Sequence, residues 1–458
     1  MVIIIISICI AFKKADNSQL VLFMIATLII SIATFLGVAL STLFFPRLKL
    51  GKITLDTYWM VALVGALVLV ATTLCPIKEI VSSWTSSNAI NPIKILILFF
   101  SMTILSIFLD EVGLFKYLAS LAVAKAKNSQ EVLFFALYFL ISFLTVFTSN
   151  DIVILTFTPF ICFFCKRVKI SPLPYLIAEF TAANTWSMMF VIGNPTNIYL
   201  ATSASITFLG YLKVMALPTV CAGIVELLII HLLFRKRLKE PLSHDNVEPY
   251  HIESKVDLIV GISHLTICLI FLIISPYIHL DMWLISLICA SSLLLFVLIT
   301  RLIKRREWHY LTNPLKRLPY QLIPFVLSMS IVVISLHYQG IADKLGELLS
   351  NMPTIFAYGT SSYLASNMVN NIPMSILFAD IPLKLETNAY YQAIYATIIG
   401  SNLGAFLTPV GALAGIMFEN LLAKYEIKYS FKDFVKYGAI TSVPTIITAL
   451  FTLFLILH

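Results

Sequence analysis

Long apolar runs, separated by short polar segments, follow one another along almost the whole chain. A helix needs about 20 apolar residues to cross the hydrocarbon core of a bilayer. Uninterrupted runs that reach or approach this length are 20–45, 57–73, 93–109, 211–234, 258–278, 282–300, 321–336 and 439–457. The pattern predicts a bundle of membrane-crossing helices.

Four further apolar regions contain polar clusters. They are 132–165, 173–201, 355–378 and 389–422. We expect 132–165 and 355–378 to be re-entrant hairpins and the other two to be broken helices. The sequence then predicts an all-α polytopic membrane protein with about 10–12 transmembrane helices plus two re-entrant hairpins.

The composition supports a membrane location. Hydrophobic residues make up 59% and charged residues 12% of the 458 residues, against about 45–50% and about 25% in soluble domains. The mean hydropathy is +0.95. A soluble fold would have too few charges to cover its surface, so we expect a multi-pass protein of the cell membrane, surrounded by lipid.

The net charge of +8 fits an excess of Lys and Arg in cytoplasmic loops. No stripe of basic and aromatic residues supports a nucleic-acid partner. Residues 1–12 are apolar, without the basic start and small-residue cleavage site of a signal peptide. Whether residues 2–12 form a membrane segment stays open at this stage.

The polar interruptions recur as two related units. In each unit a helix is followed by a broken hairpin and then by a broken span. Asn150 and Asn184 are 34 residues apart, and Asn367 and Asn402 are 35 apart. Three spans, an odd number, separate the units, so the second is upside down relative to the first. This is the inverted-topology repeat of secondary transporters.

The repeat divides the chain into five parts. Residues 1–91 form N-terminal membrane helices, and 92–235 form the first repeat. Residues 236–257 form a cytoplasmic loop, and 258–318 form linking helices with a basic loop. Residues 319–458 form the second repeat.

The interruptions supply the candidate site. Polar backbone within a membrane must be buried in protein or line a wet cavity, so we expect the four breaks to meet near the midplane. Half-helix N-termini there favour anions, while carbonyls favour Na⁺ or H₃O⁺. The candidate substrate- or ion-binding residues are Thr148, Ser149, Asn150, Asp151, Asn184, Gly193, Asn194, Thr196, Asn197, Ser366, Asn367, Asn370, Asn371, Asn402, Thr408 and Gly411. The alternative is structural, with kinks at proline and amides that join helices.

Acidic residues supply candidates for ion coupling. A carboxylate at the centre of a membrane helix costs about 2.5–3.5 kcal/mol, so Asp151 needs a cation, a proton or a basic partner. We expect it to bind the coupling ion, with a helix-capping role as the alternative. Asp110 and Glu111 end a span. They are candidates for a proton relay or for an interfacial pair.

Five motifs resemble the arsenite permease (ArsB) branch of the ion transporter superfamily, which also holds NhaD-type antiporters and citrate-type carriers. They are the segment 108–113, the segment 148–151 followed by Thr158-Pro159, and the segments 193–197, 367–373 and 400–414. The resemblance implies scaffold and transport units, hairpin tips that meet at a central site, and a homodimer. For arsenite permeases it implies efflux of trivalent arsenic against protons, sometimes with a soluble ATPase partner. Those permeases have Asp where this chain has Asn402.

We therefore expect a secondary transporter that moves an inorganic oxyanion, arsenite or another small anion, coupled to H⁺ or Na⁺, without a cofactor. The alternatives are a Na⁺/H⁺ antiporter and, from another class, a passive channel. An enzyme is not expected, because no HExxH, GxSxG or Walker A pattern occurs. Cys162 and Cys165 have the spacing of a metal pair, but they lie within an apolar run without a second pair, so no metal site is predicted.

Overall fold

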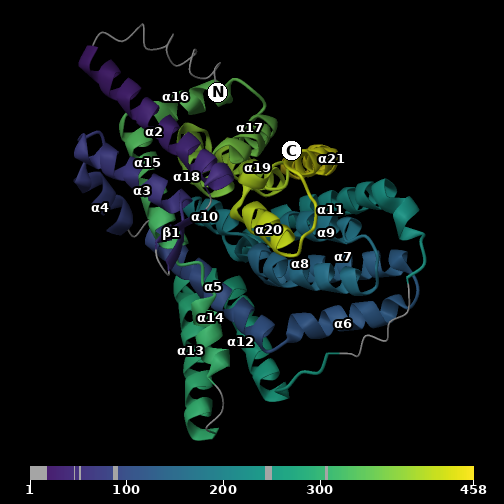
Figure 1. Ribbon diagram of the computed structural model, residues 1–458. Coiled ribbons are helices and arrows are strands. Elements are labelled where there is room, and N and C mark those ends of the chain that lie inside the picture. The colour runs from purple at the N-terminus through teal and green to yellow at the C-terminus, as the bar shows by residue number, and fades with distance from the viewer. Residues whose placement is uncertain (1–17, 46, 51–52, 86–90, 243–249, 305–307) are drawn as a thin grey trace.

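The computed structural model describes residues 18–458 except 46, 51–52, 86–90, 243–249 and 305–307 (Figure 1). The N-terminal stretch 1–12 lies outside the described residues. The fold is all-α apart from a two-stranded antiparallel sheet of β1 (Arg47–Leu50) and β2 (Ile53–Asp56). Ahead of the first repeat lie α2 (Ser18–Phe44), α3 (Tyr58–Ala71) and α4 (Ile77–Thr85).

The remaining helices follow the order that the apolar pattern predicts. The first repeat contains α5 (Pro92–Glu111), α6 (Leu114–Ala126), α7 (Gln130–Phe147), α8 (Asn150–Arg167), α9 (Leu173–Trp186), η1 (Ser187–Met189), η2 (Val191–Gly193), α10 (Pro195–Ser203) and α11 (Phe208–Leu238). The linking part contains α12 (Lys255–Ile278), α13 (Met282–Lys304) and α14 (His309–Lys316). The second repeat contains α15 (Leu322–Tyr338), α16 (Ile341–Ser350), α17 (Thr354–Val369), α18 (Asn371–Asp380), η3 (Ile381–Lys384), α19 (Thr387–Gly404), η4 (Pro409–Gly411), α20 (Leu413–Lys424) and α21 (Phe431–Leu457).

Within the described residues, seven helices are long and apolar enough to cross a membrane. Counting the bent pair of α15 and α16, with 75° between its helices, as one span gives up to eight. This count is below the predicted 10–12 because the broken spans consist of shorter helices. For example, α9 has 14 residues and α10 has 9, so neither alone reaches the length of a span.

The helices α7 and α8 form the first hairpin. Thr148 and Ser149 between them have extended backbones. The Tyr175 hydroxyl at the start of α9 donates to Oε1 of Gln130 at the start of α7, at 3.1 Å. Because α9 directly follows α8, the chain leaves the hairpin beside the point where it entered. We call this the basic side, since Lys125, Lys166 and the 235–239 segment lie there.

The second hairpin consists of α17 and α18, and the chain enters and leaves it on the side opposite the basic side. Its break is Asn370, with φ 73° and ψ 152°. The helix α16, which precedes α17, packs against η3, which follows α18. A Cβ added at Gly346 in α16 would lie 2.5 Å from the carbonyl oxygen of Ile381. This close approach holds the entry and exit of the hairpin together.

The two repeats match element by element, from α5–α11 to α15–α21. In each repeat, a glycine in the left-handed conformation separates the first helix from the second: Gly113 at φ 92° and Gly340 at φ 70°. The long last helices contain Pro218 and Pro444. These two helices, α11 and α21, pack against each other, so the repeats form one body in which α9 and α11 lie beside α19 and α21 (Figure 1).

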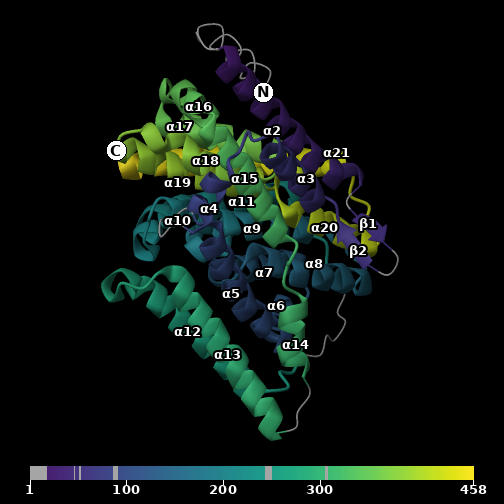
Figure 2. The same ribbon diagram turned by 90° about the vertical axis from the view of Figure 1, so that its left-hand side faces the viewer.

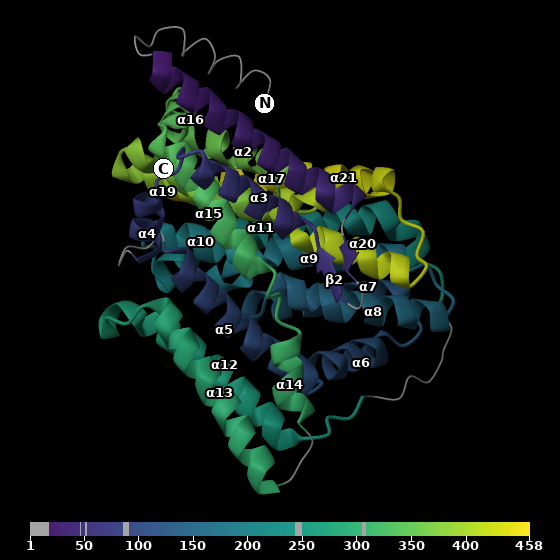
Figure 3. The same ribbon diagram turned by 60° about the vertical axis from the view of Figure 1, so that its left-hand side comes forward.

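The helices α12 and α13 form a pair that packs on α5 and extends away from this body (Figures 2 and 3). A buried ion pair holds its basic end, where Arg301 Nη2 lies 2.8 Å from Asp257 Oδ2. Many of its outward apolar side chains are exposed, such as Ile259, Ile270 and Leu295. Such exposure in a chain of this composition fits contact with lipid.

Candidate functional site

Asn402, fully buried near the end of α19, joins the second repeat to the first. Its Oδ1 accepts hydrogen bonds from Ser187 Oγ at 2.8 Å and from Asn194 Nδ2 at 2.9 Å. Its Nδ2 donates to Asn197 Oδ1 at 2.6 Å. These three partners lie in and after the break between α9 and α10. One carboxamide therefore holds the break of the opposite repeat in place.

The first hairpin tip is tied to the same break. Asn150 Nδ2 donates to Asn184 Oδ1 at 3.2 Å. The backbone carbonyl oxygen of Asn184 lies 2.6 Å from Ser187 Oγ and shares the proton of that hydroxyl with Asn402 Oδ1. Within the described residues, Asn150 Oδ1 and Ser149 Oγ are buried without a hydrogen-bond partner. Since buried polar atoms are rarely left unpaired, these two atoms are candidate contacts for a solute or an ion.

The second hairpin tip is tied to the break after α19. Asn367 Oδ1 accepts from the backbone N–H and the hydroxyl of Thr408, at 3.0 and 2.8 Å. Asn370 Nδ2 donates to the Val410 carbonyl at 3.1 Å. The first tip is thus bonded to α9 and the α9 break to Asn402, the second tip is bonded to the α19 break, and the last turn of α19 joins the two sets. We define the central cluster as Asn150, Asn184, Ser187, Asn194, Asn197, Asn367, Asn402 and Thr408.

Two glycines permit the tight path of the chain at the breaks. A Cβ at Gly193 would clash with the carbonyl oxygen of Ser187. A Cβ at Gly411 would lie 2.6 Å from the Gly404 carbonyl oxygen and 2.9 Å from Asn367 Oδ1. Backbone atoms cannot move away as a flexible side chain can, so both positions require glycine.

Other predicted residues have local partners. Thr148 Oγ1 donates back to the Leu144 carbonyl at 2.7 Å. Thr196 Oγ1 donates to Asn194 Oδ1 at 3.1 Å, and the same Asn194 oxygen caps α10 by accepting from the Thr196 backbone N–H. Ser366 packs against Gly404, where a Cβ would clash with its hydroxyl. Asn371 begins α18. These residues shape the breaks without joining the repeats.

Four helices begin at the breaks: α8, α10, α18 and α20. The N-terminus of a helix carries free N–H groups and a partial positive charge. Two of the four belong to each repeat. The cluster therefore combines positive helix ends with neutral amides and hydroxyls.

Asp151 lies in the first turn of α8 and faces a cavity beside the central cluster rather than the cluster itself. The cavity measures about 350 Å³, and its lining includes Arg47, Lys316 and Gln321. Since Arg47 and Lys316 belong to basic-side segments, the cavity lies between that side and the hairpin tip. Asp151 therefore lies where the cavity meets the tip of the first hairpin.

Asp110 and Glu111 form ion pairs at the basic end of α5. Arg317 Nη1 lies 2.7 Å from Asp110 Oδ2 and 2.6 Å from Glu111 Oε1. Asn313 Nδ2 also donates to Glu111 Oε2, at 2.8 Å. The two carboxylates fasten the segment between α14 and α15 to α5, and neither bonds to the central cluster.

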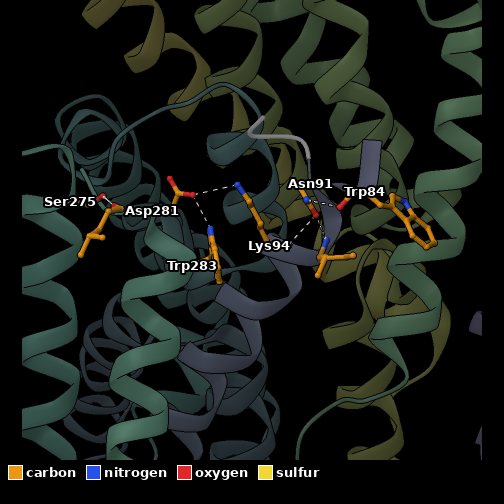
Figure 4. Close-up of polar contacts among 8 residues, drawn as sticks. Trp84, Asn91, Lys94, Ser275, Asp281 and Trp283 are labelled. Carbon is orange, nitrogen blue, oxygen red and sulfur yellow. Dashed lines mark hydrogen bonds and ion pairs between the residues drawn. The ribbon is translucent and has the colours of Figure 1, made fainter. Parts of the chain in front are cut away.

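A second cavity, of about 440 Å³, lies on the opposite side between α5, α10 and the turn from α12 to α13. At its rim Lys94 Nζ lies 3.4 Å from Asp281 Oδ2, which also accepts from Trp283 Nε1 at 2.9 Å (Figure 4). Asn91 caps α5 beside this pair (Figure 4). The lining residue of α10 is Thr202, near the end of that helix and away from its break.

The sequence did not single out Ser187, which bonds to both Asn184 and Asn402. A small hydroxyl residue three positions after Asn184, just ahead of the break, is the signal that was available. The structure also shows a buried carboxyl, Glu226, which the Thr185 hydroxyl and the Tyr138 hydroxyl both contact.

Inverted repeats whose broken helices meet at one buried cluster are typical of membrane transporters, and comparison with known proteins supports this. The chain belongs to the citrate transporter family. The sequence model of that family, described as "Citrate transporter", matches residues 57–397. The match includes both hairpin tips and ends just before Asn402.

The curated relatives agree with this family and with the resemblance to ArsB-type carriers. The "Arsenical pump membrane protein" of Escherichia coli is 25% identical over 77% of this chain and 84% of its own length. An "Uncharacterized transporter" of Synechocystis is 24% identical over 86% of this chain and 92% of its own. The chain is thus a multi-pass membrane transporter.

The fold also has a counterpart among solved structures. The YdaH transporter of Alcanivorax borkumensis, described as having an unusual topology, superposes with a TM-score of 0.56. Sequence identity is 14%, and the similarity covers 95% of this chain and 97% of that one. The whole polytopic architecture is therefore shared, which confirms the predicted fold class.

Proposed function

We propose that this transporter is a secondary active carrier that moves arsenite, or the oxyacid of a closely related metalloid, coupled to H⁺ or Na⁺. The observation that carries the proposal is the central cluster, in which Asn402 of one repeat bonds to Ser187, Asn194 and Asn197 of the other. Such a cluster binds solute at the place where two oppositely oriented units meet, as alternating access requires.

The chemistry of the cluster favours an uncharged or weakly charged solute. Each member is Asn, Ser or Thr, and these side chains supply neutral donors and acceptors. A tricarboxylate would bring several negative charges without a basic side chain in the cluster to pair with them, at a high desolvation cost. Arsenous acid is an uncharged triol near neutral pH, so its hydroxyls match amide and hydroxyl partners.

The unpaired atoms at the first hairpin tip also favour an uncharged solute with hydroxyl groups. Ser149 Oγ and Asn150 Oδ1 are free to accept hydrogen bonds from a bound solute and lie beside the positive end of α8. Relatives named arsenical pump membrane protein add weight to a metalloid substrate. The cavity at Asp151 gives such a solute a path from the basic side.

Everted membrane vesicles from cells that express the protein would test the proposal. We expect arsenite and antimonite to accumulate when a proton or sodium gradient is imposed, and citrate to remain outside. Asn402→Ala should abolish accumulation. Asn351→Ala removes an exposed asparagine outside the cluster and should leave accumulation unchanged. Accumulation of citrate but not arsenite would refute the proposed substrate.

A Na⁺/H⁺ antiporter is the second candidate, and Asp151 favours it. This carboxyl faces a cavity of about 350 Å³, where it would be accessible to ions without any solute. The same vesicles separate the two functions. Sodium-dependent release of protons in the absence of arsenite would favour antiport.

A further inference from the structure

Glu226 on α11 is a carboxyl group for which the transport cluster gives no role. It is fully buried in a membrane-spanning helix. An ionised carboxylate at such a place needs a positive partner, because its desolvation cost is several kcal/mol. None of the ion pairs among the described residues includes Glu226. Its partners are the neutral hydroxyls of Thr185, Tyr138 and Thr181.

The hydrogen bonds around Glu226 are complete when the carboxyl carries a proton. The Tyr138 hydroxyl lies 2.7 Å from the Gly223 carbonyl oxygen and 3.3 Å from Glu226 Oε1. Its single proton can serve only one of them. If it serves the nearer carbonyl, a protonated Oε1 can donate to the Tyr138 oxygen, while Glu226 Oε2 accepts from Thr185. If Glu226 were ionised, the Tyr138 hydroxyl would have to donate to the carboxylate instead of to the Gly223 carbonyl oxygen.

The partners of Glu226 also lie next to the break of α9. Thr185, which donates to Glu226, stands between Asn184 and Ser187, which bond to Asn150 and Asn402. The Trp186 indole N–H donates to the Tyr138 hydroxyl at 3.2 Å. The last turn of α9 therefore contacts the carboxyl and the central cluster together.

Close packing makes this turn a stiff connection. A Cβ added at Gly223 would lie 2.6 Å from the Trp186 ring, so the indole rests directly on the α11 backbone. A change in the hydrogen bonds of Glu226 and Tyr138 would consequently shift Trp186 and the adjacent break, because no free space separates these groups.

The charged groups around this site lie toward the basic side. His231, five residues after Glu226 on α11 and about 7.5 Å further along the helix axis, pairs with Glu131 of α7 at 2.7 Å. From α21, the Tyr437 ring packs on Phe234, with ring centroids 5.6 Å apart. From α9, the Glu179 carboxyl contacts Thr158 of α8 instead of Glu226. The hydroxyl groups are thus the polar contacts of Glu226, and the His231–Glu131 pair lies further along α11, toward the basic end of that helix.

We propose that Glu226 is a proton-binding site of this carrier, distinct from Asp151, and that its occupancy is transmitted through Thr185 and Trp186 to the break that Asn402 holds. The proposal deepens the proposed function by naming a second group that takes part in coupling. Uptake transfers one proton from water on the basic side to a Glu226 oxygen. It changes a buried anion into a neutral group that donates to Tyr138.

Infrared difference spectra of the purified protein in lipid vesicles, recorded during a pH titration without solute, would test the site directly. We expect a carbonyl band of a protonated carboxyl that titrates in the wild type and is missing in Glu226→Gln. Glutamine matches the neutral acid in shape, and its amide can donate to Tyr138, so the variant should fold. Tyr138→Phe should shift the band, because it removes the acceptor of the carboxyl proton.

Two matched variants identify the band. Glu179→Gln removes another buried carboxyl of this repeat, and Glu347→Gln removes an exposed one. Both should leave the Glu226 band in place. A spectrum of Glu226→Gln that is identical to the wild type would overturn the proposal.

Transport measurements show whether the proton on Glu226 is coupled to solute. In Glu226→Gln vesicles, arsenite exchange at equal pH should persist, while the acceleration by a pH gradient should fall at least tenfold. Unchanged acceleration would overturn the coupling role. If the wild type moves no arsenite but the titrating band still depends on Glu226, the proposed substrate fails and the proton site stands.

Discussion

The side-chain amide of Asn402 donates to Asn197 Oδ1 at 2.6 Å, and this hydrogen bond crosses from the second repeat to the first. Ser187 and Asn194 donate to the other end of the same carboxamide. Hydrogen bonds between membrane helices are worth about 0.6 kcal/mol each on average. Loss of the bonds to Asn197 and Asn194, and of the shared bond to Ser187, should therefore lower the free energy of unfolding of Asn402→Ala by about 1–2 kcal/mol.

Transport should suffer more than stability in Asn402→Ala, because the break between α9 and α10 loses the partner that fixes it. We expect arsenite accumulation in vesicles to fall at least tenfold, measured at equal protein levels alongside thermal unfolding. Asn351→Ala is the matched control. Normal transport by Asn402→Ala would show that the bridge between the repeats has no part in binding or in the transport cycle.

Gly193 and Gly411 provide a second prediction, since neither position has room for a methyl group. At Gly193 the methyl meets the Ser187 carbonyl, and at Gly411 it meets the Gly404 carbonyl at 2.6 Å. Each Gly→Ala variant should lose about 1–3 kcal/mol of stability, as overpacked cores do, and should transport poorly. Thermal unfolding in detergent and vesicle transport would measure both effects.

The comparison for these variants is Gly37→Ala, whose methyl would meet a single side-chain carbon of Val61. That side chain can move, so the loss should be smaller than at Gly193. Equal losses at Gly37 and Gly193 would show that close packing in general, rather than the tight path of the break, sets the requirement for glycine.

The sequence was sufficient to predict the breaks. Amide, hydroxyl and proline residues within apolar runs interrupt helices for local reasons, so 148–149, Asn194 and Asn370 fall where the pattern indicates. The inverted arrangement followed from the similar spacing of the motifs and the odd number of intervening spans. Both kinds of evidence are local or periodic, and a single sequence contains them.

The hydrogen-bond partners of each polar residue could not be predicted from local or periodic patterns. Asn402 bonds to residues 205 to 215 positions away, and only the packing of α19 against the break of the other repeat brings them together. Asp151 directly follows Asn150 in the chain, yet it faces a cavity while Asn150 bonds to Asn184. Adjacent helix positions point about 100° apart, and the sequence does not say which of them faces the cluster.

Arg317 gives a third prediction, which concerns the role of Asp110 and Glu111. Their pairing with Arg317 at 2.7 and 2.6 Å favours an anchor for the segment that borders the basic-side cavity. Arg317→Ala should lower the free energy of unfolding by about 1–3 kcal/mol. That range lies below the cost of breaking a fully buried pair, because Arg317 is 31% exposed and therefore partly screened.

The pH dependence of transport separates an anchor from a proton relay. If the pair is an anchor, Asp110→Asn should be less stable but keep the wild-type response of transport to pH. Lys384→Ala, which breaks a mostly exposed pair with Asp343, should cost less than about 1 kcal/mol and is the control for stability. A changed pH response in Asp110→Asn would support the relay instead.

Asp151 gives the last prediction, since its carboxyl faces the cavity that leads from the basic side to the first hairpin tip. Asp151→Asn keeps the size of the side chain and removes its charge, so the cavity and the start of α8 should persist while the attraction for a cation is lost. We expect gradient-driven accumulation of arsenite to fall at least tenfold, with exchange of arsenite between equal concentrations retained. Asp281→Asn on the opposite surface, where the carboxyl is 63% exposed, should behave like the wild type. The titrating band of Glu226 should also remain in Asp151→Asn, because the two carboxyls have different surroundings. Gradient-driven transport at the wild-type rate in Asp151→Asn would remove this residue from the coupling step and leave the cavity as a path for solute alone.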